Sequence, residues 1–165
     1  MNRQITMNNG MDVARQAAAD IESWLKKYRG TIGVVNVEKD PDFQKADIDL
    51  IWVSHRGTDT IEIKADRWQD SGNFFFETES NKEKGAPGCF LYTEANYIFY
   101  YFVKPRLLYI LPMPQTREWF LANKDRFEER ETTTPVGDGY YTTAGRLVPI
   151  EVVVSEVPEV KQKKL

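Results

Sequence analysis

The chain has 165 residues, 41% hydrophobic and 28% charged, which is the composition of one compact globular domain. It contains one cysteine and one histidine, which excludes an internal disulfide and the common cysteine- or histidine-rich metal sites, so a bound metal is expected to be held mainly by oxygen. The net charge of −3 argues against a surface that coats nucleic acid uniformly, but it is compatible with a local basic patch.

The sequence contains no apolar run of about 18 residues, the minimum for a membrane-spanning helix. Its polar beginning, MNRQITMNNG, is not followed by a hydrophobic stretch, so no secretory signal is expected. We therefore expect a cytoplasmic protein without a membrane partner. Because no repeat or linker divides the sequence, a single domain over 1–165 is expected.

The first half of the chain predicts one helix and four strands. The helix has apolar side chains at helical spacing and ends at Gly30. The strands are β-branched or aromatic runs separated by polar segments, and the second and third are close enough in sequence to form a hairpin. We expect a helix at 11–29, strands at 31–37, 48–53, 60–65 and 73–78, and an exposed, mobile loop at 81–88.

The second half of the chain alternates aromatic, apolar and charged segments. The run TEANYIFYYFVK predicts a helix capped by Thr93, although its aromatic content also suits a strand. We expect a helix at 93–104, a strand at 106–112, a helix at 116–130, a hairpin or two short strands within 140–154, and a frayed end at 159–165. The order predicts an α/β fold in which a mixed sheet is flanked by helices.

Charged residues interrupt two of the predicted strands. Glu62 and Lys64 are two residues apart and therefore share one strand face, and the hairpin brings Asp49 alongside them. Two converging carboxylates repel each other unless a divalent cation lies between them, and Mg²⁺ and Mn²⁺ prefer such oxygen ligands. A metal there can polarise a phosphodiester, and a neighbouring lysine can orient the attacking water.

This element order, with its Asp and Glu-x-Lys strands, resembles the αβββαβ core of the PD-(D/E)XK nuclease superfamily. That superfamily has a restriction-endonuclease-like fold and includes restriction enzymes, junction resolvases and phage exonucleases. The motifs are QKADIDLIW and IEIKAD, and the match covers about 12–111. The segments SGNFFFE and GCFLYTEANYIFYYF are similar to small phage and bacterial proteins of the superfamily. The proline that usually precedes the aspartate is absent here.

The resemblance implies a metal-dependent nuclease acting on DNA in a prokaryotic or phage-infected cell. It assigns Asp49 and Glu62 to the metal, Mg²⁺ or Mn²⁺, and Lys64 to the attacking water. An acidic residue from the first helix is often added in the superfamily, and Asp20 is favoured over Glu22 for that role. A homodimer is a further expectation. The implied core is about 11–111, extended by 112–154 and a flexible tail at 155–165.

Simpler interpretations stand beside these. Glu62 and Lys64 also fit an exposed cross-strand ion pair. Asp47, two residues before Asp49 and expected on the same strand face, is an alternative to it as the metal ligand. His55 is expected in an exposed turn, and Cys89 as a small buried apolar residue. Several other polar side chains are candidates for binding phosphate or supporting the metal site, although each is expected by default to be an ordinary surface residue. They are Gln44, Asn73, Glu77, Lys82, Lys84, Lys104 and Arg106.

The aromatic side chains in the second half are candidates for stacking on nucleic-acid bases, but most of them are expected in the core. They are Tyr92, Tyr97, Phe99, Tyr100, Tyr101 and Phe102. The rival function is a catalytically inactive nucleic-acid-binding or assembly protein that retains the nuclease fold. A glycosidase using the carboxylate pair is a weaker rival because it leaves Lys64 without a role.

Overall fold

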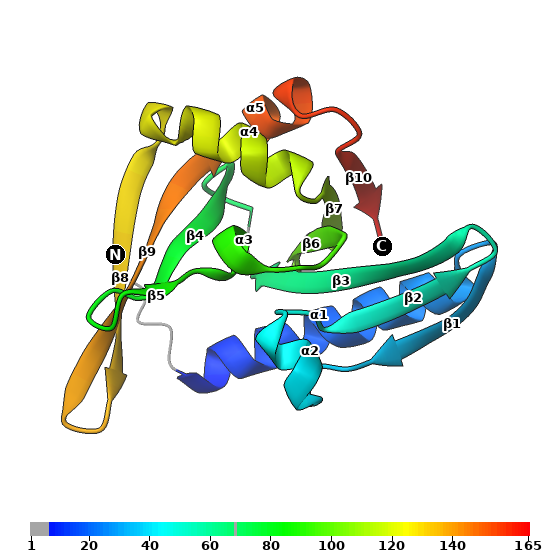
Figure 1. Ribbon diagram of the computed structural model, residues 1–165, viewed down its shortest axis with the longest axis horizontal. Helices are drawn as coiled ribbons and strands as arrows, with labels where there is room; N and C mark the ends of the chain where they lie inside the picture. Colours follow the sequence, from blue (N-terminus) through cyan, green and yellow to red (C-terminus); the bar gives the residue numbers. More distant parts are fainter. Residues whose placement is uncertain (1–6, 68) are drawn as a thin grey trace.

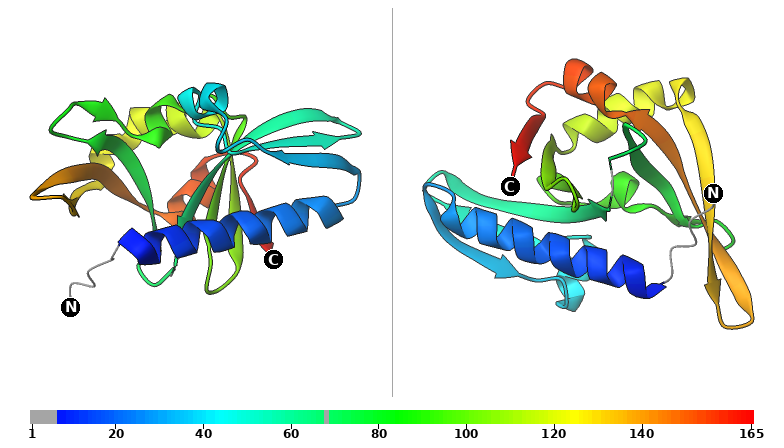
Figure 2. Two further views of the ribbon diagram at one scale, coloured as in Figure 1. Left: turned by 90° about the horizontal axis from the view of Figure 1, so that it is seen from below. Right: turned by 180° about the vertical axis from the view of Figure 1, so that it is seen from behind.

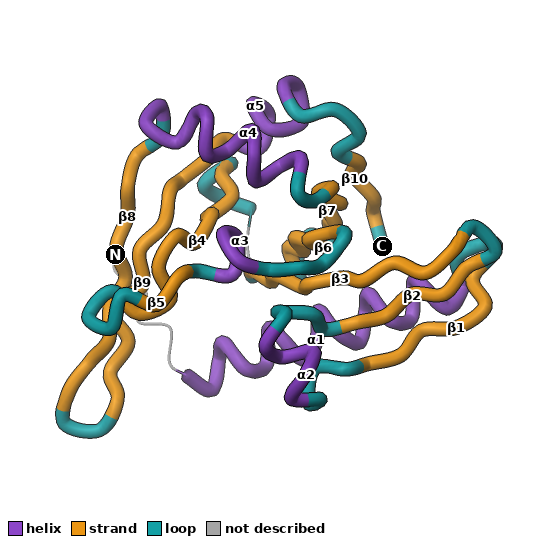
Figure 3. Tube along the Cα trace, in the orientation of Figure 1, coloured by secondary structure: helices purple, strands orange, loops and turns teal. Residues whose placement is uncertain are grey.

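A computed structural model describes residues 7–67 and 69–165. The chain forms a six-stranded mixed sheet and a four-stranded antiparallel sheet with helices packed around them, an α/β fold as predicted (Figures 1 and 3). The helices are α1 (Met7–Lys27), α2 (Pro41–Lys45), α3 (Cys89–Tyr92), α4 (Gln115–Asn123), the 3-10 turn η1 (Lys124–Arg126) and α5 (Ile150–Glu156). Among the described residues, none of these helices combines the length and apolar character needed to cross a membrane.

The six-stranded sheet has the order β1-β2-β3-β6-β7-β10 and holds the first three strands predicted from the first half of the sequence, whereas the fourth, predicted at 73–78, lies in the other sheet. All neighbours are antiparallel except β3 and β6, which are parallel. The chain reaches β6 from β3 through the second sheet, whose order is β5-β4-β9-β8. The strands of the first sheet are β1 (Thr31–Asn36), β2 (Leu50–Ser54), β3 (Gly57–Asp66), β6 (Tyr97–Phe102), β7 (Leu107–Pro112) and β10 (Lys161–Lys164).

Each face of the six-stranded sheet packs against a different core. Helix α1 lies along one face (Figure 2), where its apolar stripe of Ala17, Ile21 and Leu25 contacts side chains of β2, β3, β6 and β7. The other face packs with the four-stranded sheet, α3, α4 and α5 in a second, aromatic-rich core. The strands of the second sheet are β4 (Asn73–Asn81), β5 (Ala86–Pro87), β8 (Glu128–Val136) and β9 (Gly139–Pro149).

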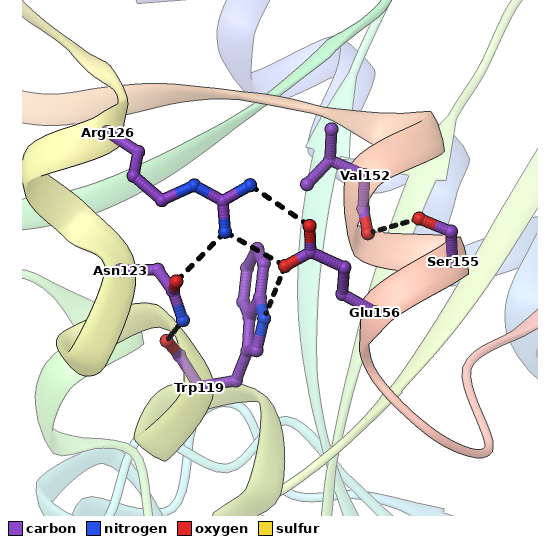
Figure 4. A network of polar contacts seen from close by, with 6 residues as sticks. All are labelled: Trp119, Asn123, Arg126, Val152, Ser155 and Glu156. Atoms are coloured by element: carbon purple, nitrogen blue, oxygen red, sulfur yellow. Dashed lines mark hydrogen bonds and ion pairs between the residues drawn. The ribbon is translucent and has the colours of Figure 1, made fainter.

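A polar network joins the end of α4 to α5 (Figure 4). The Arg126 guanidinium donates hydrogen bonds to both carboxylate oxygens of Glu156, at 2.9 and 3.0 Å, and the Trp119 indole donates to the same carboxylate at 3.1 Å. The hydrogen bond from Arg126 lowers the pKa of Glu156. The network fixes α5 against α4, and the chain continues from α5 into β10 at the sheet edge.

The predicted helix at 93–104 is wrong, because Tyr97–Phe102 forms strand β6. The strand is buried on both faces: Phe99 and Tyr101 belong to the core under α1, and Ile98, Tyr100 and Phe102 belong to the other core. A strand buried on both faces is a continuous apolar run without alternation, so its pattern does not distinguish it from a buried helix.

Three further predictions in the second half differ from the structure. The helix expected at 116–130 ends earlier, and the β-branched run after it forms β8, which pairs with β9. The segment 140–154, expected to be a hairpin or two short strands, is nearly all of the single long strand β9 followed by α5. The tail expected to be frayed forms β10, an edge strand paired with β7, whose lysines are typical of an exposed sheet edge.

The loop at 81–88, expected to be mobile, is tied to the second sheet. Its strand β5 pairs with β4, and the Glu83 carboxylate accepts hydrogen bonds from the Thr142 backbone at 2.9 Å and from the Thr142 hydroxyl at 2.6 Å. Lys82 forms an ion pair with Glu131. The hairpin is therefore anchored to β9 and β8 rather than free in solvent.

Candidate metal centre

Asp49 is held where β2 and β3 meet, at the entrance to β2. Its backbone N–H donates to the Ile61 carbonyl at 2.9 Å, and its carbonyl accepts from Val37 at 2.8 Å. Its carboxylate oxygen Oδ2 accepts a hydrogen bond from the Ile63 N–H at 2.8 Å. This bond fixes the orientation of the carboxylate, so it lies against β3 as the hairpin predicted.

Glu62 lies on the adjacent strand beside Asp49. It is 8% exposed and points to the face of the sheet opposite α1, since its neighbours Ile61 and Ile63 pack under α1. Burial, followed by the negative charges of Asp49 and Asp47, raises the pKa of Glu62 to about 11. The charged form of this carboxylate therefore needs a nearby positive charge.

Asp47 joins the same cluster, although not from the strand face that the sequence suggested. It lies in the turn after α2, in a left-handed backbone conformation with φ of 55°. Its Oδ2 atom is buried and accepts no hydrogen bond within residues 7–67 and 69–165. Burial and the charge of Asp49 raise the pKa of Asp47 to about 6. Asp47 therefore adds a third carboxylate beside the two expected metal ligands, Asp49 and Glu62.

Lys64 extends over the same face of β3. Its Nζ atom lies 3.4 Å from Oε2 of Glu77, and the two side chains are 30% and 15% exposed. Burial lowers the pKa of Lys64, but the ionisable groups around it raise that pKa by more, first Cys89 in its thiolate form and then the Glu77 carboxylate, so the net direction is upward. The ammonium stays protonated beside the carboxylates, with Glu77 of β4 as its partner.

Cys89 also borders the cluster, which the sequence did not indicate. It is buried, as expected, but its sulfur and carboxylate oxygens of Asp47 and Glu62 all lie within 4.8 Å of one another. Burial raises the pKa of the thiol to about 12, so it is neutral near pH 7. No local motif reveals this placement, because α3 reaches the site only after the chain has passed through the second sheet.

Gly88 allows α3 to approach β4 closely. A Cβ atom at Gly88 would lie 2.4 Å from the carbonyl oxygen of Glu77 and 2.7 Å from its Cγ atom. Gly88 also donates its N–H to the Thr78 carbonyl at 2.9 Å. The absence of a side chain at this position thus sets the distance between Cys89 on α3 and Glu77 on β4.

The assignment of Asp20 to this site is corrected by the structure. Its carboxylate accepts hydrogen bonds from the Tyr101 hydroxyl at 2.7 Å and from Arg106 at 3.2 Å. Tyr101 faces the core under α1, on the side of the sheet away from Glu62. The alternative, Glu22, accepts a hydrogen bond from Asn36 at 2.8 Å and is likewise separate. Both lie on α1, which covers the opposite face.

The remaining candidates have local structural contacts. Gln44 donates to the Glu38 carbonyl at 2.8 Å, and Asn73 donates to the Ser71 carbonyl at 3.1 Å, so neither contacts the carboxylates through these amides. His55 is exposed in the β2–β3 turn, as expected. Most of the aromatic residues of β6 are in the core, as expected, whereas Tyr92 is 40% exposed.

The three carboxylates fit a divalent cation. Ligand oxygens of Asp47 and Glu62 lie within 4.8 Å of each other and of the Cys89 sulfur, and Asp49 lies beside Glu62. The buried Asp47 Oδ2 accepts no hydrogen bond in the described part of the chain. Hard cations such as Mg²⁺ and Mn²⁺ prefer oxygen ligands, and a cation would offset the mutual repulsion of the carboxylates. Comparison with family models, curated proteins and solved structures found no significant match. Any conclusion about activity therefore depends on the geometry.

Proposed function

We propose that the protein is a metal-dependent nuclease that hydrolyses phosphodiester bonds in DNA. The observation that carries this proposal is that Glu62 lies beside both Asp49 and Asp47, on the face of β3 from which the Lys64 ammonium extends. Carboxylates held beside a protonated lysine suit a reaction in which negative charge develops on a phosphoryl group.

Each side chain then has a distinct role. Asp49 and Glu62 would hold Mg²⁺ or Mn²⁺, with Asp47 as an additional ligand; the ion would polarise the phosphodiester and lower the pKa of a water molecule. Lys64 orients that water and stabilises the charge developing on the phosphoryl oxygens. Glu77 positions Lys64, because its carboxylate, 3.4 Å from the ammonium, holds that ammonium on the face of β3 that carries Glu62.

The order of elements supports the proposal. When α2, β4 and β5 are treated as insertions, the chain runs α1-β1-β2-β3-α3-β6, which is the αβββαβ order expected of a restriction-endonuclease-like core. In that order Asp49 precedes β2, and Glu62 and Lys64 lie on β3, as the resemblance requires. The inserted strands bring Glu77 to the site, and the short α3 brings Cys89.

The test is incubation of the purified protein with single-stranded, duplex and branched DNA in Mg²⁺, in Mn²⁺ and in excess chelator. We expect cleavage in at least one metal and none in chelator, because the carboxylates alone do not activate water. Electrophoresis of end-labelled DNA measures the products. Tight DNA binding without cleavage in either metal would contradict the proposal and favour an inactive binding protein.

A further inference from the structure

A pocket of about 420 Å³ lies beside the end of α1, on the face of the six-stranded sheet that α1 covers. Its floor includes Asp59, Tyr97 and Phe99, which have the same strand orientation as Ile61 and therefore face away from Glu62. The pocket is thus separated from the candidate metal centre by the sheet itself. Its volume is within the range of about 300–1,000 Å³ that is typical of small-ligand sites.

The aromatic lining of this pocket is continuous. The ring centroid of Tyr28 lies 5.2 Å from that of Trp24 and 5.6 Å from that of Trp52, and Trp24 lies 6.4 Å from Phe99. The ring of Tyr97 follows at 6.5 Å from Phe99. Tyr28 is 42% exposed and Phe99 only 1%. The ring surface open to a ligand is therefore that of Tyr28 together with the partly exposed Trp24, Trp52 and Tyr97. Planar rings arranged this way offer stacking surfaces for a flat aromatic group.

The Trp52 ring is fixed in place. Its indole N–H donates to the Thr31 hydroxyl at 2.9 Å, and that hydroxyl donates to the Leu25 carbonyl at 2.7 Å. The polar edge of Trp52 is therefore satisfied by the protein. The stacking surface needs little reorganisation when a ligand binds.

Four cationic side chains line the pocket with the aromatic arc: Arg29, Arg56, Lys161 and Lys163. Two carboxylates, Asp59 and Glu159, also line the pocket, so the lining carries a net positive charge. Within residues 7–67 and 69–165, no ion pair involves any of the four cations. Their charges are available to an anion, and lysine and arginine are the usual partners of phosphate.

We propose that this pocket binds a nucleotide, with the base stacked on the aromatic arc and the phosphate held by the surrounding cations. The ligand is either a free nucleotide or the terminal nucleotide of a single strand, which share this chemistry. The pocket is independent of the proposed nuclease activity, because it uses none of the side chains of the metal centre and opens on the other face of the sheet.

Calorimetric titration with adenosine monophosphate, in chelator, tests the proposal. We expect the double variant Arg56→Glu/Lys161→Glu to bind at least about tenfold more weakly than the native chain, because both cations are exposed and contribute charge to the pocket. The double variant Lys39→Glu/Lys124→Glu has the same change in net charge at exposed positions outside the pocket and should bind as the native chain does. Equal weakening in both variants would overturn the proposal.

A second variant tests the stacking surface. Tyr28→Ala should weaken adenosine monophosphate about tenfold. Circular dichroism verifies that the variant is folded. Undetectable binding to the native chain at millimolar nucleotide, or equal affinity for inorganic phosphate and nucleotide, would overturn the proposal. A short single-stranded oligonucleotide that binds more tightly than the mononucleotide identifies a strand end as the ligand, whereas tighter binding of the mononucleotide identifies a free nucleotide.

The outcomes for the pocket and the metal centre can be separated. Lys64→Ala removes a side chain of the metal centre and leaves every residue of the pocket lining unchanged, so its affinity for adenosine monophosphate should equal that of the native chain. Nucleotide binding without DNA cleavage would refute only the proposed nuclease activity. Cleavage without nucleotide binding would refute only the pocket.

Discussion

Lys64→Ala is expected to reduce metal-dependent DNA cleavage by about 10²–10³-fold, the usual loss when one group that stabilises transition-state charge is removed. Within residues 7–67 and 69–165, the ammonium that pairs with Glu77 is that of Lys64, so the substitution removes this charge from the site. Initial rates of cleavage at saturating Mn²⁺ measure the effect. DNA affinity should change far less, because a single cation contributes little to binding of a polyanion.

Two further variants make this result interpretable. Lys64→Met retains the partly buried stem and removes only the charge, so it should lose as much activity as Lys64→Ala even if the alanine variant is less stable. Lys26→Ala removes an exposed lysine on α1, 61% exposed and across the sheet, and should retain native activity. Native cleavage rates in a folded Lys64→Met protein would disprove the role of the ammonium.

Gly88→Ala is expected to destabilise the protein by about 3 kcal/mol, at the upper end of the usual cost of overpacking. The added methyl group would lie 2.4 Å from a backbone oxygen, which cannot rotate away as a side-chain end could. Because the atoms met are those of Glu77 itself, Glu77 and α3 must move apart, which displaces the Glu77 side chain from Lys64 as well as from Cys89. Urea unfolding measures the stability, and cleavage should fall as Lys64 loses its positioning by Glu77.

Gly10→Ala is the matched control for this substitution. Gly10 lies in α1 with no heavy atom within 4 Å of its added Cβ, and alanine is favoured over glycine in helices by about 1 kcal/mol. It should raise the stability slightly and leave cleavage unchanged. If Gly88→Ala is as stable and as active as Gly10→Ala, the close approach of α3 to β4 has no role in the site.

The sequence predicts the parts of the site that depend on local geometry. Glu62 and Lys64 share a strand face because side chains alternate along a strand, and a short hairpin necessarily returns the chain beside Asp49. These relations need no knowledge of the rest of the fold. The position of Asp47, in contrast, was not predicted, because the alternation of side chains along a strand does not indicate a turn residue with positive φ.

The parts that the sequence does not predict depend on long-range packing. Glu77 and Cys89 lie on β4 and α3, which come between β3 and β6 in the sequence. They reach Lys64 only because these two elements fold back onto the face of the sheet that carries Lys64. The strand β6 itself was predicted as a helix because burial on both faces removes the alternation that marks a strand. Asp20 was misplaced because helical periodicity gives the apolar face of α1 but not the face of the sheet on which α1 packs.

Binding of Mn²⁺ to the protein without DNA tests the central claim most directly. We expect titration followed by electron paramagnetic resonance to show bound Mn²⁺ in the native chain, and at least about tenfold weaker binding in Asp49→Asn and in Glu62→Gln. Asp12→Asn, which removes an exposed carboxylate of α1, should bind as the native chain does. Native Mn²⁺ affinity in Glu62→Gln, or no bound Mn²⁺ at millimolar metal, would contradict the account.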